Sequence, residues 1–449
     1  MHHFDETTER ILQRATAYVR ERLSFEPVPL DHRGDAATLD REAPSLIGES
    51  GNDPDLVFDQ YEHILSPAVI SVDSPRFLSF IPAAPTKASM LFDMVVSASS
   101  LNGTSWLESA GAIHAENQVL RAVADLAGLP AGAGGCFLSG GSAGNLSALT
   151  VARDVARHRR GDRARMRILA SEQTHSSVTN TARILDCDVV TVPAVDGRMI
   201  GEQVAAVVAA DPDPSTFCAV VATAGTTNAG IIDDLAGIAV VAGDHHIWFH
   251  VDAAYGGAGL LSPTIRHRYD GIERADSMIV DPHKWLFAPL DCAILLYRRP
   301  ALAKGVHTQN ASYLDSIHAD EDEWNPTDYA YHLTRRARGL AMWFSLATHG
   351  LGAYRRAVDR ALEVTDYATR RIEAIDELEL VRPPDLSIVM FRRRGWTDEQ
   401  YDAWSEQLLA DGIGFVLPSR WEGETILRFA ILHPDTTEAI IDEILVTLA

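Results

Sequence analysis

Residues 247–254 read IWFHVDAA, a short apolar run that ends in a carboxylate and two small residues. Longer segments with helical spacing, such as GEQVAAVVAA (201–210), lie between this run and several others like it. The other runs are RILAS (167–171), DVVTVPA (188–194), FCAVVATAG (217–225), SMIVD (277–281) and CAILLYRR (292–299). Strands that alternate with helices predict βαβ units and an α/β fold whose large, mostly parallel sheet is covered on both faces.

The pattern changes on both sides of this central region. Residues 5–23 have apolar positions at helical spacing, which predicts an N-terminal helix, and the Pro-, Asp- and Gly-rich stretch 26–54 predicts a loop. From about residue 346 a long helical pattern precedes further short apolar runs, which predicts a small α+β domain. We therefore expect three parts: an N-terminal helical segment (1–66), a large domain (67–345) and a small C-terminal domain (346–449).

Composition narrows the classes of function and location. The 449 residues carry a formal net charge of −23, which argues against a nucleic-acid partner because phosphate backbones are bound by clustered Lys and Arg. The charged N-terminus has no long apolar run, so we expect neither a signal peptide nor a membrane span. The four cysteines form no C-x-x-C pair, which is typical of free thiols in the cytoplasm rather than of a metal site.

One lysine stands out among the basic residues. Lys and Arg together number 39, yet only Lys87, Lys284 and Lys304 are lysines. Lys284 lies just after an apolar run, in ADSMIVDPHKWLF (275–287). Burial frees a lysine amine to act as a nucleophile, whereas arginine stays protonated and cannot form an imine. A lysine that reaches from a strand end to a salt bridge is the structural alternative, and the scarcity of lysine elsewhere makes it the weaker one.

Other polar residues follow the predicted strands, at the edge where open α/β sheets bind ligands. Asp252 follows IWFHV, and a buried carboxylate is costly unless it meets a cation or hydrogen-bond donors. Capping of a neighbouring turn is the alternative role for this carboxylate. His175, in SEQTHSSV (171–178), follows another strand, although a single histidine is more often structural than functional.

Two stretches rich in small residues complete the pattern. FLSGGSAGNLSAL (137–149) has glycines directly before a helical run. Such a stretch can bind an anion through its backbone N–H groups, or it can simply form the turn between a strand and a helix. It is not a Walker loop, because no Gly-Lys-Ser/Thr follows. TAGTTNAG (223–230) likewise suits either a ligand cradle or a tight turn.

Together, these groups match the requirements of pyridoxal 5′-phosphate. The aldehyde of this cofactor needs an amine, its pyridine nitrogen needs a carboxylate, its ring needs a stacking partner and its phosphate needs N–H donors. The four kinds of group occur in succession in one chain, which is more specific than any one motif alone.

The series SGGSAGN, SEQTHSSV, GTTNAG, HVDAAYGG and DPHKW resembles the group II pyridoxal-phosphate-dependent amino acid decarboxylases. This family includes the aromatic-L-amino-acid, histidine, tyrosine and glutamate decarboxylases. The stretches 74–91 and 334–350 resemble the family's N-terminal substrate-pocket segment and its Arg-rich helix. The resemblance implies a fold-type I enzyme that binds pyridoxal 5′-phosphate and acts as a homodimer, with the site at the subunit interface and the segment 1–66 exchanged between subunits.

The resemblance also implies roles for individual residues. Lys284 would hold the cofactor as an imine, and Asp252 would pair with the pyridine nitrogen. His175 would stack on the ring, and Ala254 would pack against its other face. The further cofactor-binding residues that it implies are Gly141, Ser142, Thr227, Asp281 and His283, where Asp281 stands at a position that is often Asn in relatives.

Tyr313 matches the tyrosine of a mobile loop in this family, which would protonate the substrate Cα after CO₂ leaves. An ordinary loop aromatic is the alternative. Relatives that produce aldehydes oxidatively tend to replace either this tyrosine or the histidine that matches His175. Retention of both residues implies a true decarboxylase.

The resemblance is less decisive about the substrate. Phe80 and Pro82 match the apolar form of the substrate pocket, and Trp285 would add another apolar wall. Asn102 and Thr104 fall where aromatic decarboxylases present bulkier residues across the interface, which leaves room for an aliphatic or polar side chain. An apolar pocket separates side chains that differ by one methylene by only ~1–3 kcal/mol.

The sequence therefore predicts a cytoplasmic L-amino acid α-decarboxylase that acts on an apolar or aromatic side chain and produces an amine and CO₂. An aldehyde synthase, or another carbanion enzyme that uses the same cofactor, is the nearest alternative. An inactive binding protein on the same fold is the alternative from a different class. We expect no membrane partner and no metal.

Overall fold

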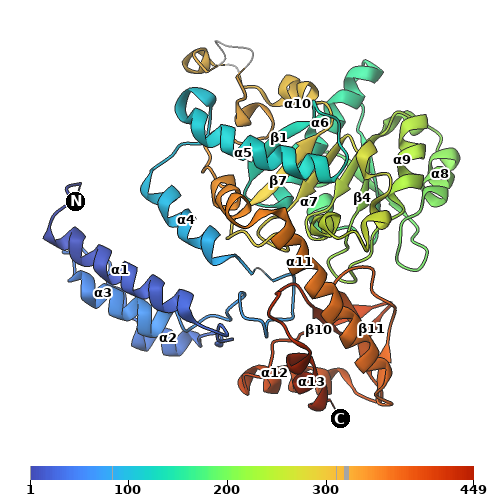
Figure 1. Cartoon of the computed structure of the whole chain (residues 1–449). Coiled ribbons are helices and arrows are strands. Elements are labelled where there is room, and N and C mark those ends of the chain that lie inside the picture. The colour runs from blue at the N-terminus through green and yellow to red at the C-terminus, as the bar shows by residue number, and fades with distance from the viewer. Residues whose placement is uncertain (1, 83, 310, 318–322, 449) are drawn as a thin grey trace.

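A computed structural model describes residues 2–448 except 83, 310 and 318–322, and the side chain of Tyr313 also lies outside the described residues. Within the described residues, the fold consists of two β-sheets, the helices that pack on them and an N-terminal group of helices (Figure 1).

The large sheet has seven strands in the order β1-β7-β6-β5-β4-β2-β3. The strands are β1 (Gly134–Leu138), β2 (Arg167–Ser171), β3 (Asp188–Val192), β4 (Phe217–Thr223), β5 (Trp248–Asp252), β6 (Ser277–Val280) and β7 (Ala293–Tyr297). Strands β3, β2, β4, β5 and β6 pair in parallel, whereas β7 runs antiparallel to both β6 and β1. The predicted α/β fold with a mostly parallel sheet is confirmed, and β7 is its antiparallel strand.

Helices cover both faces of the large sheet (Figure 1). Helices α6 (Gly141–Arg160), α7 (Ser176–Ile184) and α10 (Pro300–His307) pack on one face. Helices α5 (Trp106–Leu126), α8 (Gly201–Ala210), α9 (Leu235–Asp244) and α11 (Gly339–Glu373) pack on the other. Successive residues of a strand point to opposite faces, so Phe249 and Val251 lie in the core under α9 while Trp248 lies in the core under α6.

The small sheet is antiparallel, with the strand order β10-β11-β9-β8. Its elements are β8 (Leu378–Leu380), β9 (Ile388–Arg393), β10 (Pro418–Trp421) and β11 (Glu424–Ala430), with α12 (Asp398–Ala410) and α13 (Glu438–Val446). Helix α11 connects it to the large sheet and is broken at Gly350, whose φ of 74° is strained for any residue with a side chain. The boundary expected at 345/346 falls inside α11, shortly before this break.

The N-terminal part consists of α1 (Glu6–Ser24), α2 (Ala36–Glu42) and α3 (Pro54–Gln60), followed by α4 (Lys87–Ala98). Helix α1 confirms the helix predicted over 5–23. The loop predicted over 26–54 contains α2, because Asp35 accepts a hydrogen bond from Thr38 N and so begins a short helix. Helices α1–α3 have no buried residue and lie apart from the two sheets (Figure 1).

None of the helices in the described residues is both long and apolar enough to span a membrane. The four cysteines, Cys136, Cys187, Cys218 and Cys292, are free thiols and are all buried.

Candidate active site

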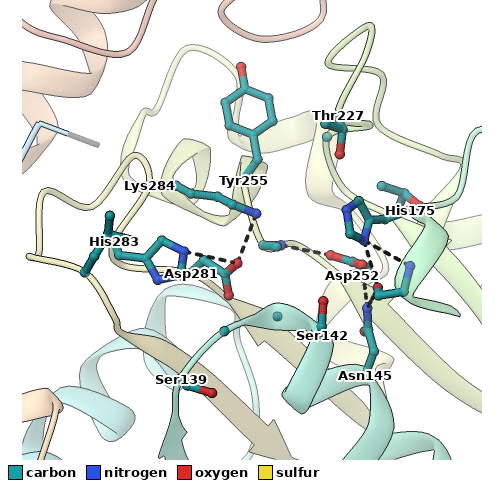
Figure 2. A pocket seen from close by; sticks show the side chains of 17 residues that line it. Ser139, Ser142, Asn145, His175, Thr227, Asp252, Tyr255, Asp281, His283 and Lys284 are labelled. Carbon is teal, nitrogen blue, oxygen red and sulfur yellow. Dashed lines mark hydrogen bonds and ion pairs between the residues drawn. The ribbon is translucent and has the colours of Figure 1, made fainter. Parts of the chain in front are cut away.

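The carboxyl ends of β4, β5 and β6 and the first turn of α6 surround one cavity of about 360 Å³ (Figure 2). Parallel strands bring their carboxyl ends to the same edge, which is why side chains far apart in the sequence meet here. The predicted residues that line the cavity are Gly141, Ser142, His175, Thr227, Asp252, Ala254, Asp281, His283 and Lys284.

Asp252 is buried at the end of β5, and both of its carboxylate oxygens accept hydrogen bonds. Oδ1 accepts from the backbone N–H of Ala254 at 3.1 Å, and Oδ2 accepts from Asn145 Nδ2 at 3.0 Å. These donors offset the cost of burying a carboxylate. Asn145 was not predicted as a site residue, and its place one turn into the helix that follows the glycine-rich stretch was the available signal.

Lys284 and Asp281 form an ion pair on the other side of the cavity (Figure 2), with Nζ 3.0 Å from Asp281 Oδ2. His283 Nδ1 accepts a hydrogen bond from Cys292 N, and its Nε2 lies 3.8 Å from the same Asp281 oxygen. Burial lowers the pKa of His283, which keeps the ring neutral near pH 7. Asp281 Oδ1 is buried without a hydrogen-bond partner among the described residues. The salt bridge considered for Lys284 thus exists, and it leads into the cavity rather than to the surface.

His175 is the N-cap of α7, where its Nδ1 accepts a hydrogen bond from Ser177 N at 3.2 Å. Ser177 Oγ lies 2.8 Å from the same nitrogen and also accepts from Asn145 Nδ2 at 2.9 Å. Asn145 therefore contacts both Asp252 and Ser177, and connects the two predicted residues Asp252 and His175. Ser177 was not predicted, and the sequence offers only its place two residues after His175 as a signal.

The first turn of α6 faces the cavity without a side-chain cap, because its N-cap is Gly140. Unoccupied N–H groups at the start of a 20-residue helix attract anions. A Cβ atom added to Gly141 would lie 3.0 Å from Asp281 Oδ2, a tight contact that glycine avoids where α6 approaches Asp281. Ser142 adds a hydroxyl to the same wall of the cavity.

Trp285 does not form the apolar wall of the substrate pocket that the resemblance implied. It is fully buried, does not line the cavity, and stacks on Tyr255 with ring centroids 5.5 Å apart. The chain turns after Asp281, with Lys284 N donating to Asp281 O, so that the lysine side chain enters the cavity and the next residue points into the core. Tyr255, which does line the cavity, is the aromatic residue that the sequence interpretation missed.

The other expected substrate-pocket residues also lie away from the cavity of the single chain. Phe80 is 60% exposed, and Pro82 is buried outside the cavity lining. Asn102 and Thr104 hydrogen-bond to each other and do not line the cavity, and Asn102 also donates to Glu108. For Phe80 the physical reason is the small domain, because Leu78, two residues earlier, pairs through its backbone with residues of that domain.

Arg428 is a buried cation that the sequence interpretation missed. From β11 it donates to the carbonyl oxygens of Thr227 at 2.8 Å, Asn228 at 3.2 Å and Phe80 at 2.9 Å. Burial lowers the pKa of Arg428 to about 10. It thereby ties the small domain to the loop that carries Thr227 and to the segment that carries Phe80. An arginine inside the apolar run TILRFA was the available signal.

Tyr313 belongs to the short helix Ser312–Leu314, and its side chain lies outside the described residues. The catalytic role of Tyr313 therefore stays a prediction.

Comparison with known proteins gives consistent matches in sequence and structure. The family model described as the pyridoxal-dependent decarboxylase conserved domain matches residues 38–394. The aromatic-L-amino-acid decarboxylase of Bacillus atrophaeus is 28% identical over 430 residues, which cover 91% of this chain and 88% of that protein. The L-2,4-diaminobutyrate decarboxylase of Rhizobium meliloti is 32% identical over 389 residues, which cover 83% and 77%. The crystal structure of Oryza sativa TDC with PLP and tryptamine superposes with a TM-score of 0.92 at 26% identity, covering 100% of this chain and 99% of that one.

Proposed function

This chain belongs to the pyridoxal-dependent decarboxylases and is a pyridoxal-5′-phosphate-dependent amino acid decarboxylase, and we propose that its substrates are L-amino acids with an aromatic or other apolar side chain. The observation that carries the substrate class is the similarity to an aromatic-L-amino-acid decarboxylase across nine-tenths of the chain.

The donor and acceptor groups of the cavity fit the cofactor. The described lining of the cavity includes the primary amine of Lys284 and two carboxylates, of which Asp252 is already held by two hydrogen-bond donors. The uncapped first turn of α6 supplies N–H donors for a phosphate, and glycine at 141 avoids a tight contact with Asp281. When bound, pyridoxal 5′-phosphate accepts the electron pair that remains on Cα once CO₂ has left.

The proposed roles follow from these positions. Lys284 would bind the aldehyde carbon and Asp252 would hold a proton on the pyridine nitrogen. His175 and Ala254 would contact the two faces of the ring. Tyr313 would protonate Cα, which would favour the amine over the aldehyde product.

Asp281, His283, Gly141, Ser142 and Thr227 form the remaining cofactor-binding set in this proposal. Asp281 is the residue least like a phosphate ligand, because its carboxylate is negative. Its contact with Lys284 instead supports a role in holding the amine in position.

A short basic side chain is the second candidate substrate. It is favoured by the diaminobutyrate decarboxylase of Rhizobium meliloti, which at 32% is more similar in sequence than the aromatic decarboxylase of Bacillus atrophaeus at 28%. The polar pair Asn102 and Thr104, where aromatic decarboxylases have bulkier residues, is compatible with this candidate.

A product assay tests the substrate class. The cofactor-loaded protein is mixed in air with L-tryptophan, L-tyrosine, L-phenylalanine, L-2,4-diaminobutyrate, L-lysine and L-glutamate, and mass spectrometry follows amine, aldehyde and keto acid. We expect amines from the aromatic substrates, with kcat/KM at least about tenfold above that for the basic and acidic ones. Amine from diaminobutyrate alone would replace the aromatic proposal with the basic one. Aldehyde as the main product would instead indicate a synthase.

We also propose that the enzyme is a cytoplasmic homodimer. The four free, buried cysteines are typical of proteins in a reducing compartment. Helix α4 exposes large apolar side chains, with Leu91 at 47%, Met94 at 44% and Val95 at 51%, and Leu107 at the start of α5 is 62% exposed. Exposed large apolar side chains at helical spacing on one helix, as on α4, are typical of a protein–protein interface.

The dimer is tested by placing a charge on this surface. We expect the wild-type protein to sediment at about twice the chain mass of 49.0 kDa, and Val95→Glu to sediment as a monomer, because a buried unpaired carboxylate opposes association. Val240→Glu on α9 is the matched control, since Val240 is exposed to a similar extent, 47% against 51%, and should leave the dimer intact. Monomeric wild-type protein would refute the proposal.

A further inference from the structure

The carboxyl end of strand β5 lies at the cavity, and its amino end lies at the opposite end of the parallel strands. Trp248, His250 and Asp252 alternate along it and therefore point to the same face, the one that α6 covers. Asp252 lies at the cavity, and Trp248 lies about 13 Å away along the strand. All three side chains are at least 95% buried. They belong to one continuous series of side-chain hydrogen bonds, whose direction can be worked out from the chemistry of its members.

The far end of the series is Trp248, whose indole N–H can only donate. Trp248 Nε1 donates to Ser277 Oγ at 2.8 Å. Ser277 keeps its own hydroxyl proton and can donate it to its other neighbour, His250 Nδ1, at 2.7 Å. In that arrangement His250 carries its own proton on Nε2, which lies 2.8 Å from Asn145 Oδ1. Burial lowers the pKa of His250 to about 4, which keeps the ring neutral near pH 7, as this arrangement requires.

The direction of the series is set at the cavity end by Asp252, because a carboxylate oxygen can only accept. Asn145 turns its Nδ2 toward Asp252 Oδ2 at 3.0 Å and Ser177 Oγ at 2.9 Å, which leaves its Oδ1 for His250. His250 Nε2 must therefore donate to Asn145 Oδ1, which leaves His250 Nδ1 to accept from Ser277 Oγ, in agreement with the contacts at the Trp248 end. Ser177 Oγ accepts from Asn145 and has its own proton left for His175 Nδ1 at 2.8 Å.

A second donor meets the same nitrogen of His175. The backbone N–H of Ser177 lies 3.2 Å from His175 Nδ1, and a backbone N–H can only donate. His175 Nδ1 is therefore an acceptor in both contacts. The proton of the neutral imidazole must then lie on Nε2.

We propose that this buried series is a polarised hydrogen-bond relay that positions Asp252 and His175 for the cofactor and fixes the proton of His175 on Nε2. Its members outside that pair are the positioning residues Trp248, Ser277, His250, Asn145 and Ser177. The inference rests on the proposed roles of Asp252 and His175. It adds that the orientation of donors and acceptors at these two residues extends through buried groups to the far end of β5.

The first test removes a member that does not line the cavity. Ser277→Ala deprives His250 Nδ1 of its donor and Trp248 Nε1 of its acceptor, so that His250 is free to adopt the other tautomer and oppose the Asn145 amide. We expect the dissociation constant of pyridoxal 5′-phosphate, measured by absorbance titration of the cofactor-free protein, to rise about tenfold. Ser405→Ala is the matched control, because Ser405 is a buried serine of the small domain that donates one hydrogen bond, to Val416 O at 2.6 Å. It should lose stability but change the dissociation constant by less than about twofold.

Equal cofactor binding by Ser277→Ala and Ser405→Ala would overturn the relay.

The second test does not depend on any variant that must bind cofactor. Nitrogen-15 NMR of histidine-labelled, cofactor-free protein reports the tautomer of each ring, with His175→Gln and His250→Gln used to assign the signals. Both rings should carry their proton on Nε2, and a proton on Nδ1 of either would refute the proposal. Both tests remain informative if the enzyme turns over none of the amino acids in the product assay, because neither test measures turnover.

Discussion

Lys284→Arg is expected to abolish decarboxylation, with kcat falling by about 10⁴-fold or more. Arginine keeps the positive charge and can retain the contact that Lys284 makes with Asp281, but it cannot form an imine with the cofactor aldehyde. The measurement is kcat with the best amino acid of the product assay, together with the mass of the protein after borohydride reduction. Wild-type protein should carry one covalently bound cofactor per chain, and Lys284→Arg should carry none.

The matched control for this variant is Lys304→Arg. Lys304 is one of the two other lysines and lies on α10, where its Nζ is 3.9 Å from Asp328. An arginine can make the same contact, so activity and covalent cofactor should stay at the wild-type level. Retention of more than about a tenth of the activity by Lys284→Arg would assign the covalent bond to another amine.

Asp252→Asn is expected to lower kcat by about 10²–10³-fold while the protein remains folded. The substitution keeps the size of the side chain but replaces one carboxylate oxygen with an N–H₂ group, and it removes the negative charge that would hold a proton on the pyridine nitrogen. It also places an N–H donor where Asn145 Nδ2 or the backbone N–H of Ala254 already donates. The measurements are kcat, the absorbance spectrum of the bound cofactor and the midpoint of thermal unfolding.

Asp281→Asn is the informative comparison, because Asp281 is the other buried carboxylate of the cavity. It lies against Lys284 and the start of α6, so its substitution should change kcat by less than about tenfold. If Asp281→Asn proved as damaging as Asp252→Asn, the assignment of Asp252 to the pyridine nitrogen and of Asp281 to the Lys284 amine would have to be revised.

The fold and much of the cavity could be predicted because both depend on local patterns. Short β-branched runs separated by helical segments specify a mostly parallel sheet, and polar residues directly after those runs must meet at one edge. This reasoning brought Asp252, His175 and Lys284 to one place. The family predicted from the sequence was also confirmed, and the motifs that indicated it lie at the ends of these strands.

The positions of the other site residues depend on contacts between segments that are distant in the sequence. The direction of Trp285 is set by the turn after Asp281, which sends alternate side chains into the cavity and into the core. The position of Phe80 depends on pairing of its segment with the small domain and on Arg428, 348 residues later in the chain. Asn145 and Ser177 became visible as site residues only once α6 and α7 were placed over β5. No spacing rule in the sequence encodes such pairings.

The order of strands in the large sheet also has a consequence for biosynthesis. The neighbour of β1 in this sheet is β7, and Gly134 pairs with Tyr297. At a synthesis rate of about 5–20 residues per second, β1 leaves the ribosome roughly 10–30 s before β7 exists to pair with it. During that interval its backbone hydrogen-bonding groups lack their strand partner, which is the condition that favours aggregation of a nascent chain. Completion of the large sheet, and with it the cavity, must therefore wait until about two-thirds of the chain has been translated.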